Sequence, residues 1–311
     1  MARAKAPATR IQKSGTGHSY YLDGEKCPGV TTILGNGIPK PGLIGWASNI
    51  PADVVANALT VMKSKTTGKT HIVADDLIEE LRVWQESRTN KKVPWNTNTP
   101  LPRAAVADAI SSLRYRDLDA AARKGTDVHK ICHQLAEGEE VEIPEALTGH
   151  VTSYLKFLDD WKPYDAVVER VIVNRRWRYM GQLDLLAKFD NLPTYIADKI
   201  GKTSGVGLLD IKTSRSGIFA EVALQLEAYR RGETMLEGAG EIPMPAVDFV
   251  AAIHVRADGY DVYSFDIETV LRPTTFDIFL YAKQVGDFLD WKNGAASRIK
   301  SDSLHPQRPA Q

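Results

Sequence analysis

The order of apolar segments in the second half of the chain restricts the fold more than any other feature. From residue 117 to residue 267 the apolar residues change from a helical period to a strand period and back. The segments are a helix in "DLDAAARKGTDVHKICHQLAEG", strands in "DAVVERVIVN", "RYMGQLDLLAKF" and "GVGLLDIKTS", a helix in "EVALQLEAYRRGETML", and a strand in "AVDFVAAIHV" that the "RADGY" turn joins to "DVYSFDI". This α-β-β-β-α-β order predicts an α/β protein with a mixed sheet flanked by helices.

The remaining sequence suggests four parts. We predict a flexible basic arm (1–17), an N-terminal hairpin and helical region (18–120), an α/β core with a closing amphipathic helix over 274–292 (121–295), and a disordered tail (296–311). The hairpin is expected in "HSYYLDGEKCPGVTTIL", with its turn at Asp23-Gly24, and the stretch from about residue 46 to residue 123 is expected to be mainly helical. The arm contains basic residues and no acidic residue. It could therefore contact phosphate, or it could be a solvated tail without a specific role.

Composition excludes little. Lysine plus arginine equals aspartate plus glutamate at 39 each, so the overall charge neither supports nor excludes nucleic acid. The two cysteines, Cys27 and Cys132, are too few for a disulfide framework and fit a reducing compartment. No apolar run reaches membrane-spanning length, and the basic N-terminus lacks the apolar segment of a signal peptide. We therefore expect a cytoplasmic protein without a membrane partner.

The segment "GVGLLDIKTS", residues 205–214, carries two charges on one face of an otherwise apolar strand. Asp210 and Lys212 should lie about 7 Å apart, and burying them is costly unless they have partners. Asp184, in "GQLDLL" on the preceding predicted strand, adds a second carboxylate. With the backbone carbonyl of Ile211, these oxygens are the kind that bind Mg²⁺ or Mn²⁺. A surface strand with an ordinary ion pair is the alternative.

A histidine one helical turn after Gly125 is a further candidate ligand. His129 lies in "GTDVHK", where a glycine inside a helix suggests close approach of another group. A structural histidine is the alternative. His133 follows one turn later, and histidines four residues apart can hold zinc, but no further ligand at zinc-like spacing accompanies them. The sequence therefore favours His129 alone.

The helix in "EVALQLEAYRR" places a polar amide among apolar residues. Gln225 falls within the stripe formed by Val222, Leu226 and Tyr229, where a buried amide needs hydrogen-bond partners. Gln225 and Tyr229 are one turn apart and face the same way. Alone, this pattern also fits an ordinary amphipathic helix edge.

Together the motifs form an ordered set, with G-x-x-x-H on a helix, G-x-L-D and D-I-K-T-S on successive strands, and Q-x-x-x-Y on the next helix. This set resembles the RecB-like branch of the PD-(D/E)xK nuclease superfamily. The segments "YYLDGEKCPGVTTIL" and "AEVALQLEAYRRG" are similar to phage-encoded members related to the CRISPR-associated nucleases, so the likeness extends over residues 18–290. It implies a restriction-endonuclease-like αβββαβ core with an N-terminal hairpin and a helical insertion.

The resemblance also implies roles for individual residues. It makes His129, Asp184, Asp210 and the carbonyl of Ile211 the metal site, Lys212 the catalytic lysine, Gln225 and Tyr229 neighbours of that site, and Glu169 a weaker additional candidate. Arginines that are candidates for lining a DNA path, with solvated strand and helix edges as the alternative, are Arg175, Arg176, Arg178, Arg215, Arg230 and Arg231.

The implied activity is that of a metal-dependent DNA nuclease, most simply an exonuclease in phage DNA replication, recombination or repair. Its cofactor would be Mg²⁺ or Mn²⁺, its partners DNA with a free end and replication or recombination proteins, and its location the host cytoplasm. CRISPR-associated relatives often hold an iron–sulfur cluster with four cysteines, which this chain lacks, so we predict no such cluster.

Two alternatives remain from the sequence. One is a non-catalytic DNA-binding or assembly module that retains the nuclease fold. The other is a different enzyme that uses aspartate and lysine, although the chain contains no G-x-x-x-x-G-K-[ST] loop, dinucleotide glycine fingerprint or G-x-S-x-G elbow.

Overall fold

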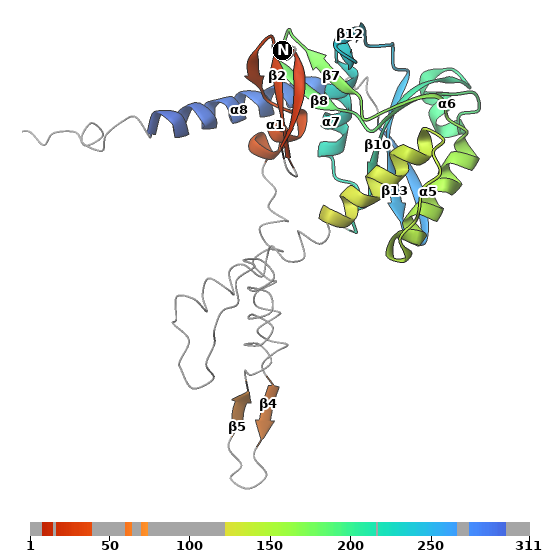
Figure 1. Cartoon of the computed structure of the whole chain (residues 1–311), viewed down its shortest axis with the longest axis vertical. Helices are drawn as coiled ribbons and strands as arrows, with labels where there is room; N and C mark the ends of the chain where they lie inside the picture. The colour runs from red at the N-terminus through yellow and green to blue at the C-terminus, as the bar shows by residue number, and fades with distance from the viewer. Residues whose placement is uncertain are drawn as a thin grey trace, which may run out of the picture. The chain divides into compact units, whose positions relative to one another are not determined.

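The computed structural model describes residues 8–14, 17–38, 60–63, 70–73, 122–215, 217–265 and 274–296 (Figure 1). The chain divides into two compact units, residues 1–39 with 125–311, and residues 40–124. Within the second unit the described strands are β4 (Thr60–Lys63) and β5 (Thr70–Val73), which form an antiparallel hairpin. The sequence-based prediction of a mainly helical region did not include this hairpin, and the rest of residues 46–121 lies outside the described residues.

A five-stranded mixed sheet forms the centre of the first unit, with strand order β14-β13-β10-β9-β6. Its strands are β6 (Tyr164–Val168), β9 (Leu185–Phe189), β10 (Gly205–Lys212), β13 (Phe249–Arg256) and β14 (Gly259–Phe265). Strands β10 and β13 are parallel, and the other neighbours are antiparallel. The predicted α/β class with a mixed sheet is confirmed.

Helices cover both faces of this sheet (Figure 1). One face packs against a helix over residues 122–136, α5 (Thr148–Trp161) and α6 (Thr194–Ile200); the other packs against α1 (Val30–Gly37), α7 (Glu221–Arg230) and α8 (Thr275–Ala296). Leu208 and Leu209 belong to the two opposite cores, as strand alternation requires. Because both faces are covered, β10 is apolar at successive positions. The closing helix predicted over 274–292 is confirmed as α8.

Two segments expected to be single strands are each two short strands in different sheets. "DAVVERVIVN" contains β6 and β7 (Val171–Asn174), and "RYMGQLDLLAKF" contains β8 (Tyr179–Gln182) and β9. Strands β7 and β8 belong to a four-stranded sheet of order β12-β11-β7-β8, with β11 (Thr234–Glu237) and β12 (Gly240–Pro243). Apolar alternation continues across the break between β8 and β9, and the adjacent charges Glu169 and Arg170 at the other break do not enter the sequence-based prediction as a strand end. Strand β11 also includes the end of the segment predicted as the second helix.

The N-terminal hairpin is confirmed. Strands β2 (Gly17–Leu22) and β3 (Glu25–Cys27) meet at Asp23 and Gly24, whose φ angles of 51° and 90° suit a tight hairpin turn. Strand β1 (Arg10–Ser14) pairs with β2, so the prediction of a flexible arm is wrong for these residues. Residues 1–7 lie outside the described part of the chain, as do 297–311 of the predicted tail. Among the described helices, none is both long and apolar enough to cross a bilayer.

Candidate active site

Asp210 and Lys212 lie at the carboxyl end of β10 and form an ion pair. Nζ of Lys212 is 2.7 Å from Oδ2 of Asp210, and the aspartate is almost completely buried while the lysine remains partly exposed. The expected 7 Å spacing along the strand is thus bridged by the length of the lysine side chain. The costly burial of a carboxylate is offset by this partner.

Helix α7 supplies the second partner of Asp210. Nε2 of Gln225 donates to Oδ1 of Asp210 at 2.7 Å and lies 3.2 Å from the hydroxyl of Tyr229. Oε1 of Gln225 in turn accepts from Nζ of Lys212 at 3.4 Å. The ring of Tyr229 fits against Gly181 of the G-x-L-D motif, where a Cβ atom would lie 2.5 Å from Cε1 of the ring. The structure therefore brings these four predicted residues into one contact network.

Asp184 lies in the break between β8 and β9, not within a strand as the sequence predicted. The pairing of β9 with β10 ends at Leu185 opposite Leu209. Beyond that point the backbone N–H of Ile211 donates to Oδ2 of Asp184 at 2.8 Å. The carboxylate thus replaces the missing strand partner and is fixed beside the Asp210–Lys212 pair.

Two histidines of the 122–136 helix face the same carboxylate. Nδ1 of His129 lies 3.5 Å from Oδ2 of Asp184, and Nε2 of His133 lies 3.9 Å from Oδ1. One donor atom from each of these three side chains lies within 4.8 Å of the others, an arrangement that could hold a metal ion. Gly125 allows the approach predicted for it, because a Cβ there would be 3.3 Å from Oγ1 of Thr213, just after β10.

Glu169 follows β6 at the other break between the sheets. Its Oε1 lies 3.0 Å from Nδ1 of His133. This acid, a weaker candidate from the sequence, therefore contacts the histidine that the sequence argument set aside. The spacing of His129 and His133, four residues apart on one helix, was the available signal for including both.

The charged groups of the site change one another's pKa values. Burial raises the pKa of Asp210 from 3.8 to about 6, even though Lys212 acts in the opposite direction. For Asp184 burial also raises the pKa, but His129 and Lys212 outweigh it and hold the pKa below its usual value. Burial lowers the pKa of His129, but the negative charge of Asp184 raises it by more. The pKa of His129 is therefore above its usual value. The two carboxylates, His129 and Lys212 thus form one electrostatic unit.

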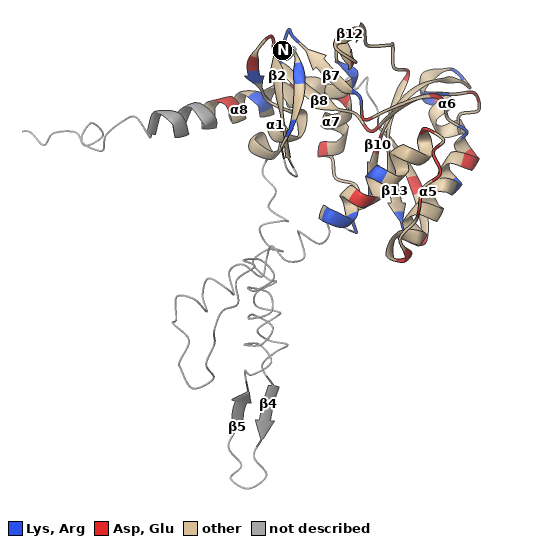
Figure 2. Cartoon of the chain, in the orientation of Figure 1, with Lys and Arg blue, Asp and Glu red and all other residues tan. Residues whose placement is uncertain are grey.

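Most of the candidate DNA-binding arginines form ion pairs with carboxylates of the same chain, and basic and acidic positions are interspersed along the described ribbon (Figure 2). The pairs are Arg175 with Glu241 and Asp23, Arg178 with Glu25, and Arg230 and Arg231 with the buried Glu227. The guanidinium of Arg176 lies 5.5 Å from the ring of Trp177. Arg215 is exposed three residues after Lys212.

His254 was not identified from the sequence. It lies on β13 in register with Lys212, is buried, and its Nε2 is 2.7 Å from the carbonyl oxygen of Ser214. Its Nδ1 is 3.3 Å from the guanidinium of Arg256, which can only donate, so Nε2 carries the proton and donates to Ser214. His254 thereby anchors the chain that follows Lys212. A polar residue within the apolar run "AAIHV" was the signal, the same one that identified Lys212.

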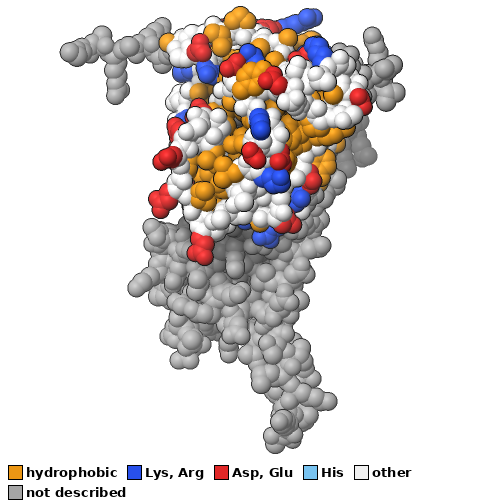
Figure 3. Space-filling view, turned by 90° about the vertical axis from the view of Figure 1, so that its right-hand side faces the viewer, with side chains coloured by type: hydrophobic (Ala, Val, Ile, Leu, Met, Phe, Trp, Pro, Cys, Tyr) orange, Lys and Arg blue, Asp and Glu red, His pale blue; other side chains and the backbone are white. Residues whose placement is uncertain are grey.

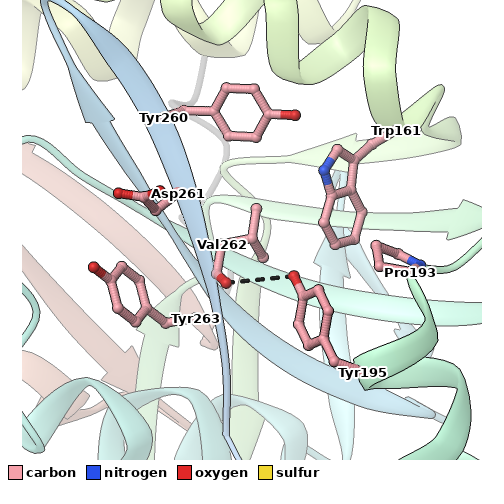
Figure 4. Close-up of a pocket in the computed structure, with 7 residues that line it drawn as sticks. All are labelled: Trp161, Pro193, Tyr195, Tyr260, Asp261, Val262 and Tyr263. Atoms are coloured by element: carbon pink, nitrogen blue, oxygen red, sulfur yellow. Dashed lines mark hydrogen bonds between the residues drawn. The ribbon is translucent and has the colours of Figure 1, made fainter.

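A shallow groove lies beside β14, and none of the predicted site residues lines it (Figure 4). It is lined by Trp161, Pro193, Tyr195, Tyr260, Asp261, Val262 and Tyr263. The hydroxyl of Tyr195 donates to the carbonyl of Val262 at 3.4 Å, across the outer edge of the strand. A space-filling view of one side of the chain shows hydrophobic side chains interspersed with charges of both signs (Figure 3).

In comparisons with known proteins, no family model and no curated protein matches the chain.

The raised pKa of Asp210 predicts how stability depends on pH in the absence of metal. Between pH 3.8 and about 6 the native carboxyl retains a proton that the unfolded chain has lost. The wild type should therefore lose stability, relative to Asp210→Asn, as the pH rises through this window. In chelator near pH 8 we expect Asp210→Asn to be more stable by about 1–3 kcal/mol, and the difference should vanish below about pH 4. Denaturant unfolding at both pH values measures it.

Asp248→Asn is the matched control with the opposite sign. Burial raises the pKa of Asp248, but Lys202 and the N–H of Val206 outweigh it and the net direction is downward. This variant should be less stable than the wild type near pH 8. An Asp210→Asn variant that is also destabilised near pH 8 would show that the charged form of Asp210 is favoured by the fold.

Proposed function

We propose that the chain is a metal-dependent DNA nuclease that hydrolyses phosphodiester bonds as an exonuclease. The observation that carries this proposal is the Asp210–Lys212 ion pair at the end of β10, beside the carboxylate of Asp184 and the imidazole of His129. Carboxylate and imidazole donors next to a single ammonium suit a reaction at a phosphodiester, where negative charge grows on the phosphate.

The donor set fits a divalent cation. Asp184, His129 and His133 place one donor atom each within 4.8 Å of one another, and the charge of Asp184 contributes to the raised pKa of Asp210. Two carboxylates and imidazole nitrogen are suitable ligands for Mg²⁺ or Mn²⁺. When bound, such a cation activates water and neutralises charge on the phosphate.

The chain's own residues prepare the site for that chemistry. Lys212 retains its proton, because burial lowers its pKa less than the two neighbouring carboxylates raise it. Its ammonium can therefore orient water or stabilise charge on the scissile phosphate. Gln225 fixes Asp210, and Tyr229 lies against Gln225, so the carboxylate is held in one orientation. These roles account for the burial of Gln225 and of the Tyr229 hydroxyl on α7.

The arrangement of elements supports the same proposal. The 122–136 helix, strands β6, β9 and β10, helix α7 and strand β13 follow in the order that the family resemblance implies, and β13 is parallel to β10. A role in phage DNA replication, recombination or repair, with replication or recombination proteins as partners in the host cytoplasm, rests on that resemblance alone.

Digestion of end-labelled linear and covalently closed circular DNA tests the reaction. With Mn²⁺ or Mg²⁺ we expect linear DNA to be degraded from its ends, circles to remain intact, and chelator to abolish activity. Equal rates on circles and linear DNA would indicate an endonuclease. Undiminished cleavage after exhaustive metal removal would contradict the metal requirement, and DNA binding without hydrolysis under any metal would favour the non-catalytic module.

Replacement of Lys212 tests the central residue. Lys212→Met keeps the apolar stem and removes the ammonium, so we expect a folded protein that binds DNA and Mn²⁺ but cleaves at least about a hundredfold more slowly, a loss of about 2.7 kcal/mol in transition-state stabilisation. Lys212→Arg should also be slow, because a planar guanidinium does not replace a compact ammonium.

The matched control is Lys188→Met on the neighbouring strand β9, where the lysine is exposed and pairs with Asp165. This change should leave the cleavage rate within about twofold of the wild-type rate, because an exposed ion pair contributes little to the stability of the fold. Single-turnover cleavage of linear DNA compares all the variants. Near wild-type cleavage by Lys212→Met would make the lysine a structural ion-pair partner and remove the basis of the mechanism.

A further inference from the structure

We propose that His133 is a second imidazole ligand of the cation, that Glu169 orients it, and that the site consequently prefers a transition-metal cation such as Mn²⁺ over Mg²⁺. This inference rests on the metal centre of the proposed function and names its metal class. It also assigns a purpose to Glu169, which the sequence left as a weak candidate.

The burial of the two ring nitrogens of His133 is the first observation. His133 is only 6% exposed, and among the described residues neither Nδ1 nor Nε2 has a hydrogen-bond partner. Nε2 is the nitrogen on the side of Asp184. That nitrogen points at the carboxylate of Asp184, 3.9 Å from Oδ1. A buried polar atom without a partner is costly, and 3.9 Å is too long for a hydrogen bond between the two groups. A cation bound by both Nε2 of His133 and Oδ1 of Asp184 would give the buried nitrogen a partner.

Glu169 supplies the second observation. Its Oε1 lies 3.0 Å from Nδ1 of His133 without the alignment of a hydrogen bond, and its negative charge favours the ring proton on that nitrogen, which leaves the lone pair on Nε2. A carboxylate behind a histidine in this way is the usual partner of metal-bound imidazole, where it fixes the ring orientation and raises ligand basicity.

The backbone of Glu169 is itself held in an unfavourable conformation. Its φ of 47° is left-handed, which is uncommon for a residue other than glycine. Nε2 of Gln182 donates to its carbonyl at 2.9 Å, and its own N–H donates to the carbonyl of Asp184 at 3.4 Å. The chain thus keeps Glu169 at the break between the sheets, where its side chain reaches His133.

The resulting donor set determines the metal class. His129 approaches Oδ2 of Asp184 while His133 approaches Oδ1, so two nitrogens surround one carboxylate. Imidazole nitrogen suits transition-metal cations such as Fe²⁺ and Zn²⁺, and Mn²⁺ accepts it more readily than Mg²⁺, which prefers oxygen ligands and retains its water. A site with a single histidine would discriminate less between the two groups of cations.

Calorimetric titration of the chelator-stripped full-length chain with MnCl₂ and with MgCl₂, without DNA, tests the inference. We expect Mn²⁺ to bind at least about tenfold more tightly than Mg²⁺. His133→Ala should weaken Mn²⁺ binding at least about tenfold and change Mg²⁺ binding by less than about threefold. Glu169→Gln should weaken Mn²⁺ binding about 10- to 100-fold. His18→Ala, which removes an exposed histidine on β2, is the matched control and should change neither affinity.

Equal wild-type affinities for the two ions would overturn the inference, as would unchanged Mn²⁺ binding in His133→Ala. Because His133 is buried, melting curves in chelator must show that the variant is folded. If it is not, pulsed electron paramagnetic resonance of the Mn²⁺-bound wild type decides: coupling to two imidazole nitrogens is expected, and coupling to one or none would overturn the assignment. No DNA is present, so a failure of the nuclease proposal would leave this result unaffected.

Discussion

The carboxylate of Asp184 accepts the backbone N–H of Ile211 at the point where the pairing of β9 with β10 has ended, and the candidate site is built around this bond. It fixes an acidic group at the break between two sheets, beside the charged end of β10. The same carboxylate faces both histidines of the 122–136 helix. This hydrogen bond joins Asp184, in the break between the sheets, to strand β10. The histidines of the helix then lie against the carboxylate that the bond has fixed.

The sequence predicted the parts of the site that depend on local spacing. Asp210 and Lys212 share a strand face, and Gln225 and Tyr229 share a helix face, so their contacts follow from strand and helix periods once the two elements pack together. The Asp23-Gly24 turn is similarly local, because two residues with positive φ are needed there.

The missed features depend on contacts between distant segments. Apolar residues lie on both sides of Glu169 and Arg170, so these two adjacent charges are the only local mark of the break where the chain leaves one sheet for another. His133 was set aside because no further ligand follows at zinc-like spacing, and the third candidate donor, Asp184, lies about fifty residues away in sequence. His254 acquires its partner only when β13 pairs with β10.

The proposed nuclease depends above all on a cation at Asp184. The most direct measurement is an anomalous difference map from crystals of the full-length chain grown with Mn²⁺. The account predicts a peak within about 2.5 Å of a carboxylate oxygen of Asp184 and within ligand distance of His129. An ion bound elsewhere, or no ion at saturating Mn²⁺ with the site otherwise as described, would contradict it.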